Sequence, residues 1–146
     1  MTKSDAINYA WATAVEAALS LIDLLPHTAQ STMDDTTAMA EFRTIRMSFG
    51  SRRGLTTWIC SYAEKDDLIV VKNGEQLEQL RRTLNPDAYI TSHYGLTRML
   101  PSTLRSLSDC RRVFIDRGLS FDERQQKEIY RATMHSPEQR WLFLGE

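Results

Sequence analysis

The sequence predicts a single α/β domain, a three-layer sandwich built on a mostly parallel five-stranded sheet with an extra N-terminal helix. From residue 42 onward, segments with the pattern of a strand alternate with segments with the pattern of a helix, and strands joined in this way pair in parallel. Residues 68–71 (LIVV) and 113–115 (VFI) are continuously apolar, as expected of strands covered on both faces. A length of 146 residues is typical of one domain.

Residues 1–41 are expected to form an N-terminal helical extension. Apolar residues recur at steps of three and four over residues 4–25, among them Ile7, Trp11 and Val15, which predicts an amphipathic helix. Pro26 ends this helix because its ring clashes with a continuing helical backbone. Residues 27–37 are polar and predict a loop, with a short helix at 34–41 as the alternative.

The core, residues 42–146, divides where the periodicity changes and where turn residues occur. We expect strands at residues 42–49, 67–71, 88–92, 111–116 and 140–145. Helices are expected at residues 55–65, 74–84, 95–107 and 122–134, with Asp122 near the start of the last helix as its cap. The large aromatic and thiol side chains stand in apolar surroundings and are expected in the interior: Trp11, Trp58, Trp141, Cys60 and Cys110.

Composition and charge exclude several classes of protein. Hydrophobic residues make up 42% of the chain and charged residues 25%, which is typical of a globular domain. The net charge of −1 argues against binding of nucleic acid or anionic membrane through bulk charge alone. Neither a signal peptide nor an apolar run near the ~20 residues of a membrane span is visible, which predicts a cytoplasmic protein without membrane contact.

The turn after the first strand is the candidate site, because open α/β sheets bind ligands at the carboxyl ends of their strands. Its glycines permit a tight backbone path whose N–H groups, with the positive end of the next helix, hold a phosphate. Arginines would add charge-assisted bonds to phosphate oxygens, and Thr56 could offer a hydroxyl to Mg²⁺. The predicted phosphate-binding residues are Gly50, Ser51, Arg52, Arg53, Gly54, Thr56 and Thr57.

Together with residues 113–116 (VFID) and 142–145 (LFLG), this turn resembles the P-loop NTPases, especially the ATPase core of phage terminase large subunits and helicase-like proteins. The resemblance covers roughly residues 42–146. It implies that Asp116 ends a Walker B strand and holds Mg²⁺ together with Thr56. It also implies that the nucleotide is Mg–ATP or Mg–ADP and that the first strand is central in the sheet.

The chain departs from the family pattern at two catalytic positions. The lysine that reaches the β- and γ-phosphates falls on Leu55, and the catalytic acid after the Walker B aspartate falls on Arg117. Phosphoryl transfer depends on positioning and electrostatics, so both losses together should lower turnover by several orders of magnitude. We therefore expect an impaired enzyme or no enzyme at all.

The function expected from this pattern is a catalytically impaired P-loop-like binding module, a phage- or virus-encoded accessory or inhibitor protein that acts in the host cytoplasm. It favours a protein partner and leaves a nucleic-acid partner open, and it does not predict the oligomeric state. The alternative is a slow or partner-completed Mg-ATPase in which Arg52 or Arg53 replaces the lysine. A third hypothesis is a single-stranded nucleic-acid binder that uses arginine and tryptophan.

Overall fold

The computed structural model describes residues 2–23, 40, 42–48, 54–98, 110–136 and 138–146. The helices are α1 (Lys3–Asp23), α3 (Leu55–Tyr62), α4 (Gly74–Thr83), α5 (His93–Thr97) and α7 (Glu123–Thr133), together with the 3₁₀ helix η2 (Gly118–Ser120). The strands are β1 (Thr44–Met47), β2 (Leu68–Val71), β3 (Tyr89–Ser92), β4 (Arg112–Asp116) and β5 (Arg140–Leu144). Each predicted strand is present, with boundaries within a few residues of those expected.

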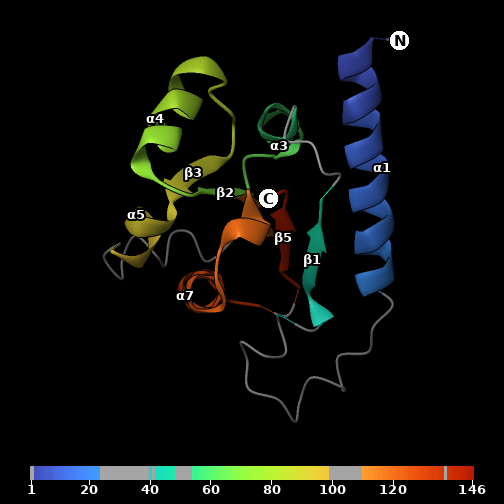
Figure 1. Ribbon diagram of the computed structural model, residues 1–146. Coiled ribbons are helices and arrows are strands. Elements are labelled where there is room, and N and C mark those ends of the chain that lie inside the picture. The colour runs from blue at the N-terminus through green and yellow to red at the C-terminus, as the bar shows by residue number, and fades with distance from the viewer. Residues whose placement is uncertain (1, 24–39, 41, 49–53, 99–109, 137) are drawn as a thin grey trace.

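The strands form a five-stranded sheet in the order β1-β5-β4-β2-β3, and every neighbouring pair is parallel. Helices α1, α3 and α4 cover one face of the sheet, and α5 and α7 cover the other (Figure 1). This arrangement confirms the predicted α/β three-layer sandwich. Because the strands are parallel, their carboxyl ends lie at one edge of the sheet, where ligand sites of such folds form.

Alternate residues of the central strands supply two separate apolar cores. Ile69, Phe114 and Leu142 pack under α1, α3 and α4, whereas Leu68 and Val113 pack under α5 and α7. The expected core aromatic and thiol residues are all buried: Trp11, Trp58, Trp141, Cys60 and Cys110. The rings of Trp11 and Trp58 stack with their centroids 5.9 Å apart, so α1 is fixed to α3 by aromatic packing.

Strand β1 lies at the edge of the sheet within the described part of the chain, and the expectation of a central first strand was wrong. Its Arg46 is exposed, with the guanidinium carbon 5.4 Å from the ring centroid of Phe143. The same group donates to the side-chain oxygen of Gln126 over 3.2 Å. An edge strand has one side open to water, so Arg46 needs no buried carboxylate.

The helices differ from expectation chiefly at their ends. Helix α5 begins at His93 and not at residue 95, because the Ser92 hydroxyl accepts a hydrogen bond from the backbone N–H of Gly95 and caps it. Helix α5 ends at Thr97 with Arg98 as its C-cap. Residues 99–107 of the predicted 95–107 helix and nearly all of the 34–41 segment lie outside the described residues. Asp122 caps α7 in a reciprocal capping box with Gln125, as expected of a cap. No described helix is long and apolar enough to cross a membrane.

The amino edge of the sheet is held by a buried ion pair between neighbouring strands. Asp67, just before β2, accepts hydrogen bonds from Nε and Nη2 of Arg112 at the start of β4, the shortest being 2.7 Å. Oδ2 of Asp67 also accepts a hydrogen bond from the backbone N–H of Glu64 over 2.8 Å. Because both charges are hydrogen-bonded as well as paired, their burial is compensated.

Gly118 and Gly74 form a matched pair that tests how tightly η2 packs on β5. A Cβ at Gly118 would lie 2.5 Å from the backbone Cα of Phe143, whereas a Cβ at Gly74 meets nothing within 4 Å. We expect Gly118→Ala to lower the free energy of unfolding by about 1–3 kcal/mol or more through overpacking. Gly74→Ala should leave it unchanged or raise it slightly. Urea unfolding of both variants measures this, and equal stability would show that η2 can move away from β5.

Candidate functional site

Two predicted site residues from distant parts of the chain meet at the carboxyl edge of the sheet. Thr56 lies in the first turn of α3, and Asp116 is the last residue of β4. The Thr56 hydroxyl donates a hydrogen bond to Oδ2 of Asp116 over 2.7 Å. Strand β5 separates β1 from β4, so α3 reaches across the end of β5 to make this contact. The structure thus brings together the hydroxyl and the carboxylate that the sequence assigned to one site.

The Asp116 carboxyl group is buried, with 5% of the residue exposed. Its second oxygen, Oδ1, has no hydrogen-bond partner among the described residues. Burial raises the pKa of this carboxyl group, while the Thr56 hydrogen bond, the positive charge of Arg117 and the backbone N–H of Arg117 act in the opposite direction. A buried oxygen with no partner is costly in a folded protein, which marks this carboxylate as a candidate ligand-binding group.

The N-terminus of α3 supplies the second element of the site. Gly54 occupies the N-cap position with a left-handed backbone (φ 79°) and makes no side-chain cap hydrogen bond. The first turn of a helix carries a partial positive charge and free N–H groups that attract anions. Thr57, in the same turn, is exposed. The predicted loop residues Gly50, Ser51, Arg52 and Arg53 lie outside the described residues.

A cavity of about 390 Å³ lies beside the Thr56–Asp116 contact, between α3 and α4. It is lined by Thr56, Thr57, Gln76, Gln79, Leu80, Thr83, Leu84, Asp116 and Arg117. The sequence analysis did not predict that α4 lines the cavity. The P-loop pattern concerns only the loop after β1 and the end of β4, and it carries no information about which helix lies beside them. The signal was present nonetheless, since Gln76, Gln79 and Thr83 recur at helical spacing on one face of a strongly amphipathic helix.

The two residues that depart from the P-loop pattern, Leu55 and Arg117, lie in different environments. Leu55, at the position of the phosphate lysine, is buried in the core and packs against Gly145 just after β5. A Cβ at Gly145 would collide with the Leu55 side chain, and the backbone there is left-handed (φ +78°). Arg117 is exposed with a left-handed backbone (φ 54°) and lines the cavity. Arg117 thus brings a positive charge to the rim of the cavity beside Asp116.

Lys72, which follows β2 at the same edge, does not reach the cavity. Its Nζ donates to the backbone oxygen of Ser120 over 2.8 Å and lies 4.6 Å from the ring centroid of Phe121. These contacts lie on the α5 and α7 face of the sheet, opposite the face on which Asp116 meets α3. Its positive charge is thus directed away from the cavity.

The described residues contain no cluster of three or more His, Cys, Asp or Glu side chains that could hold a metal by themselves. Asp116 and Thr56 together offer oxygen ligands, the type that Mg²⁺ prefers. Mg²⁺ usually binds through one or two protein groups and completes its six ligands with water and phosphate oxygens. The donor set therefore fits a Mg²⁺ ion that arrives with a phosphate.

A scan against protein-family models found no match, and searches of curated proteins and of solved structures also found none. The resemblance to P-loop NTPases therefore remains a prediction from the sequence, and the edge position of β1 departs from what that resemblance implies.

The titration of Asp116 can be measured through stability. Its pKa is raised in the folded protein, so its contribution to the free energy of unfolding is largest at low pH and is lost as the pH rises through that raised pKa. Each unit of the shift corresponds to about 1.4 kcal/mol. Asp116→Asn keeps an acceptor for Thr56 and removes the charge, so its stability relative to the unchanged protein should increase from about pH 4 to about pH 7.

Urea unfolding of both proteins at several pH values measures this difference, with Asp122→Asn as the control on an exposed helix cap. A stability difference between Asp116→Asn and the unchanged protein that stays constant across the pH range would contradict the raised pKa.

Proposed function

We propose that this protein is a catalytically impaired binding module that holds a Mg²⁺-bound phosphate ligand at the carboxyl edge of its sheet. The hydrogen bond between Thr56 and Asp116 carries the proposal, because it joins the first turn of a helix to a buried carboxylate whose second oxygen lacks a described partner. In the cell it would act as an accessory or inhibitor protein that contacts a protein or nucleic-acid partner.

Electrostatics support a phosphate ligand that comes with a divalent cation. Asp116 alone would repel a phosphate, and its carboxylate needs a positive group to offset burial. A Mg²⁺ ion between carboxylate and phosphate satisfies both anions, while the N-terminus of α3 and Arg117 add positive charge at the cavity. Binding should therefore require the cation and the phosphate together.

The same residues argue against turnover. The side chain of Leu55 is directed into the core and cannot donate to a phosphate. Arg117 cannot accept a proton from an attacking water, because its guanidinium stays protonated. The site keeps groups that bind charge and has lost groups that activate water, which favours binding over catalysis.

A slow or partner-completed Mg-ATPase is the second candidate. The observation in its favour is that Thr56 and Asp116, which such an enzyme would use to hold Mg²⁺, are in contact. It requires that a partner protein supply the base that Arg117 cannot provide. Arg52 and Arg53, which would replace the lysine, lie outside the described residues.

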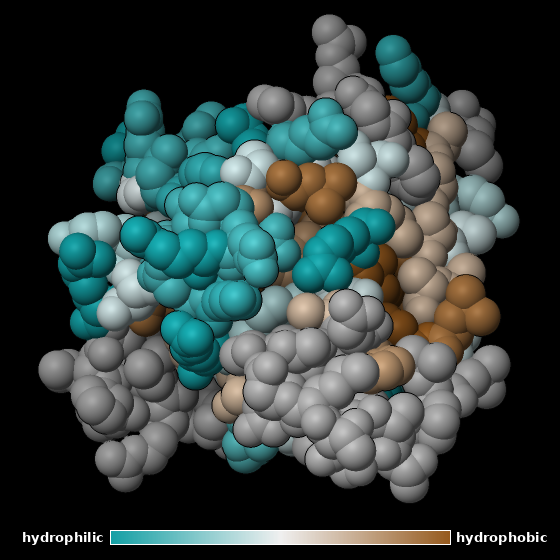
Figure 2. All heavy atoms as spheres, turned by 60° about the horizontal axis from the view of Figure 1, so that its bottom comes forward, coloured by the Kyte–Doolittle hydropathy of each residue, from teal (hydrophilic) through white to brown (hydrophobic). Residues whose placement is uncertain are grey.

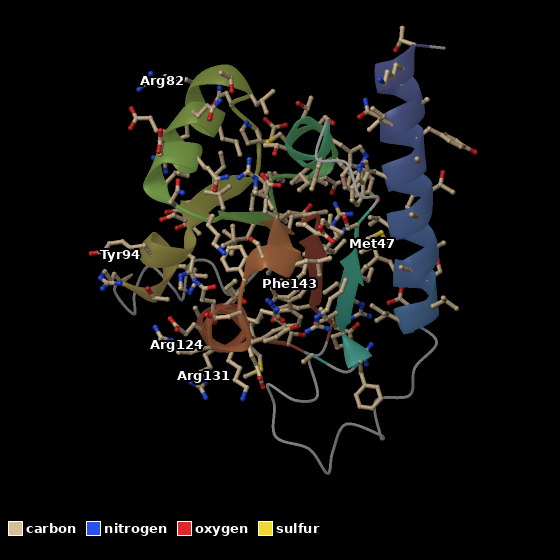
Figure 3. All side chains as sticks on the ribbon, in the orientation of Figure 1. Met47, Arg82, Tyr94, Arg124, Arg131 and Phe143 are labelled. Atoms are coloured by element: carbon tan, nitrogen blue, oxygen red, sulfur yellow. The ribbon has the colours of Figure 1, made fainter. Side chains whose placement is uncertain are left out.

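The surface of α7 argues against a nucleic-acid partner at this face. Hydrophilic side chains gather over α7 (Figure 2), where Arg124 and Arg131 extend away from the helix (Figure 3). Arg124 pairs with Glu128 at 3.1 Å and Lys127 with Glu123 at 3.5 Å, so the surface is of mixed sign. Nucleic acid requires a predominantly positive surface. The three tryptophans that might have stacked on bases are buried.

Ligand binding can be tested by thermal denaturation with Mg²⁺ alone, Mg–ADP and Mg–ATP. A ligand at a hundredfold excess over its dissociation constant adds about 2.7 kcal/mol, which raises the melting temperature by several degrees. We expect Mg–ADP and Mg–ATP to stabilise the protein, EDTA to abolish the effect and Asp116→Asn to remove most of it. Asp122→Asn, a matched substitution on the other face, should respond like the unchanged protein. No shift with any nucleotide would overturn the proposal.

Turnover is tested separately by phosphate release from Mg–ATP over many hours. We expect release no faster than from Asp116→Asn, because the water-activating acid is replaced by Arg117. Multiple turnovers that Asp116→Asn eliminates would show an ATPase and would contradict catalytic impairment.

A further inference from the structure

We propose that α1 positions the candidate site: it holds the first turn of α3 where the Thr56 hydroxyl reaches Asp116, and a displacement of α1 opens that contact. The N-terminal helix, to which the sequence assigned no part in the site, is thereby a control element of ligand binding. The effect on binding rests on the proposed function, whereas the effect on the contact between Thr56 and Asp116 does not.

The first turn of α3 lacks the local capping that would fix its position. Helix α3 has eight residues, and Gly54 at its N-cap makes no side-chain cap hydrogen bond. Helices α4 and α7, in contrast, are capped by the side chains of Asn73 and Asp122. Short helices are marginal in water and depend on tertiary packing. The place of Thr56 is therefore decided by what the first turn of α3 packs against.

Helix α1 contacts α3 at two points that are one helical turn apart. A Cβ at Gly54 would lie 3.1 Å from Cγ2 of Ile7, so this side chain lies against the Gly54 backbone. One turn further along both helices, the buried rings of Trp11 and Trp58 stack with their centroids 5.9 Å apart. Contacts spaced by four residues on each helix lie on one face, so together they fix the tilt of α3 as well as its distance from α1.

The Thr56 hydroxyl and the α1 contacts lie on opposite sides of α3. Thr56 is two residues after Gly54 and two before Trp58, which places it about 200° around the helix from each. Its hydrogen bond to Asp116 is 2.7 Å long, and a shift of about 1 Å would take the two oxygens beyond hydrogen-bond range. Helix α1 therefore supports α3 from behind, and withdrawal of that support is enough to break the contact.

Three substitutions on α1 separate this role from general stability. Ile7→Ala removes the methyl group that lies against Gly54, whereas Ile7→Val keeps Cγ2 and is the conservative variant. Ile22→Ala is the matched control, because Ile22 is buried in the same core but lies at the other end of α1. The N-terminal half of α1 runs beside α3 and its C-terminal half beside β1 (Figure 1).

The first test needs no ligand and combines each α1 variant with Thr56→Val, which removes the hydroxyl. Urea unfolding should show that Thr56→Val destabilises the unchanged protein, Ile7→Val and Ile22→Ala by similar amounts. In Ile7→Ala its effect should be much smaller, because the hydrogen bond is already open. The Trp58 amide, which donates to the backbone oxygen of Gly54 over 2.8 Å, should exchange about tenfold faster in Ile7→Ala than in Ile22→Ala.

The second test is calorimetric titration of the full chain and its variants with Mg–ADP. We expect Ile7→Ala to weaken binding by about tenfold or more, although Ile7 does not line the cavity. Ile7→Val and Ile22→Ala should stay within about twofold of the unchanged protein. A purely structural role of Ile7 would instead lower stability and leave the affinity of the folded protein unaltered.

The outcomes separate this proposal from the proposed function. Additive effects of Ile7→Ala and Thr56→Val on stability would overturn the positioning role of α1, whatever the affinity for the ligand. Equal losses of affinity in Ile7→Ala and Ile22→Ala would also overturn it. If the unchanged protein fails to bind Mg–ADP, the proposed function is contradicted, and non-additivity in the first test would still support the positioning of Thr56 by α1.

Discussion

The central strand β4 begins and ends with a charged residue, and the arrangement of the molecule depends on how those two charges are buried. At the amino edge, Arg112 is paired and hydrogen-bonded to Asp67, which precedes β2. At the carboxyl edge, Oδ2 of Asp116 accepts a hydrogen bond from the neutral hydroxyl of Thr56, and Oδ1 has no hydrogen-bond partner among the described residues. The apolar residues between them form the middle of both cores.

The two ends of β4 therefore differ in how fully their polar groups are hydrogen-bonded. The ion pair of Arg112 and Asp67 joins the starts of β4 and β2, and its polar groups are already hydrogen-bonded within the protein, so it needs no ligand. A buried carboxylate with a hydroxyl at one oxygen and no described partner at the other is incomplete by itself. Departures from full polar satisfaction are expected at functional sites, and here the departure lies at the edge of a parallel sheet where ligands bind.

Leu55 and Arg117, the two residues that depart from the P-loop pattern, have structural contacts of their own. Leu55 fills the space beside Gly145, whose backbone N–H donates to Met47 and whose oxygen accepts from Leu119. An apolar side chain at this position thus packs the end of β5 against α3 and η2. Arg117 brings a positive charge to the cavity. One of the two residues therefore contributes to packing and the other to the charge of the cavity.

The sequence by itself determined the fold class, the existence of each strand, the cap at Asp122 and the burial of the tryptophans, because these follow from local periodicity and from side-chain chemistry. It also pointed to Thr56 and Asp116 as parts of one site, through a resemblance. Only the tertiary structure decided that β5 lies between β1 and β4, that β1 is an edge strand and that α4 lines the cavity. Strand order and helix pairing depend on contacts between distant segments, and local patterns do not encode them.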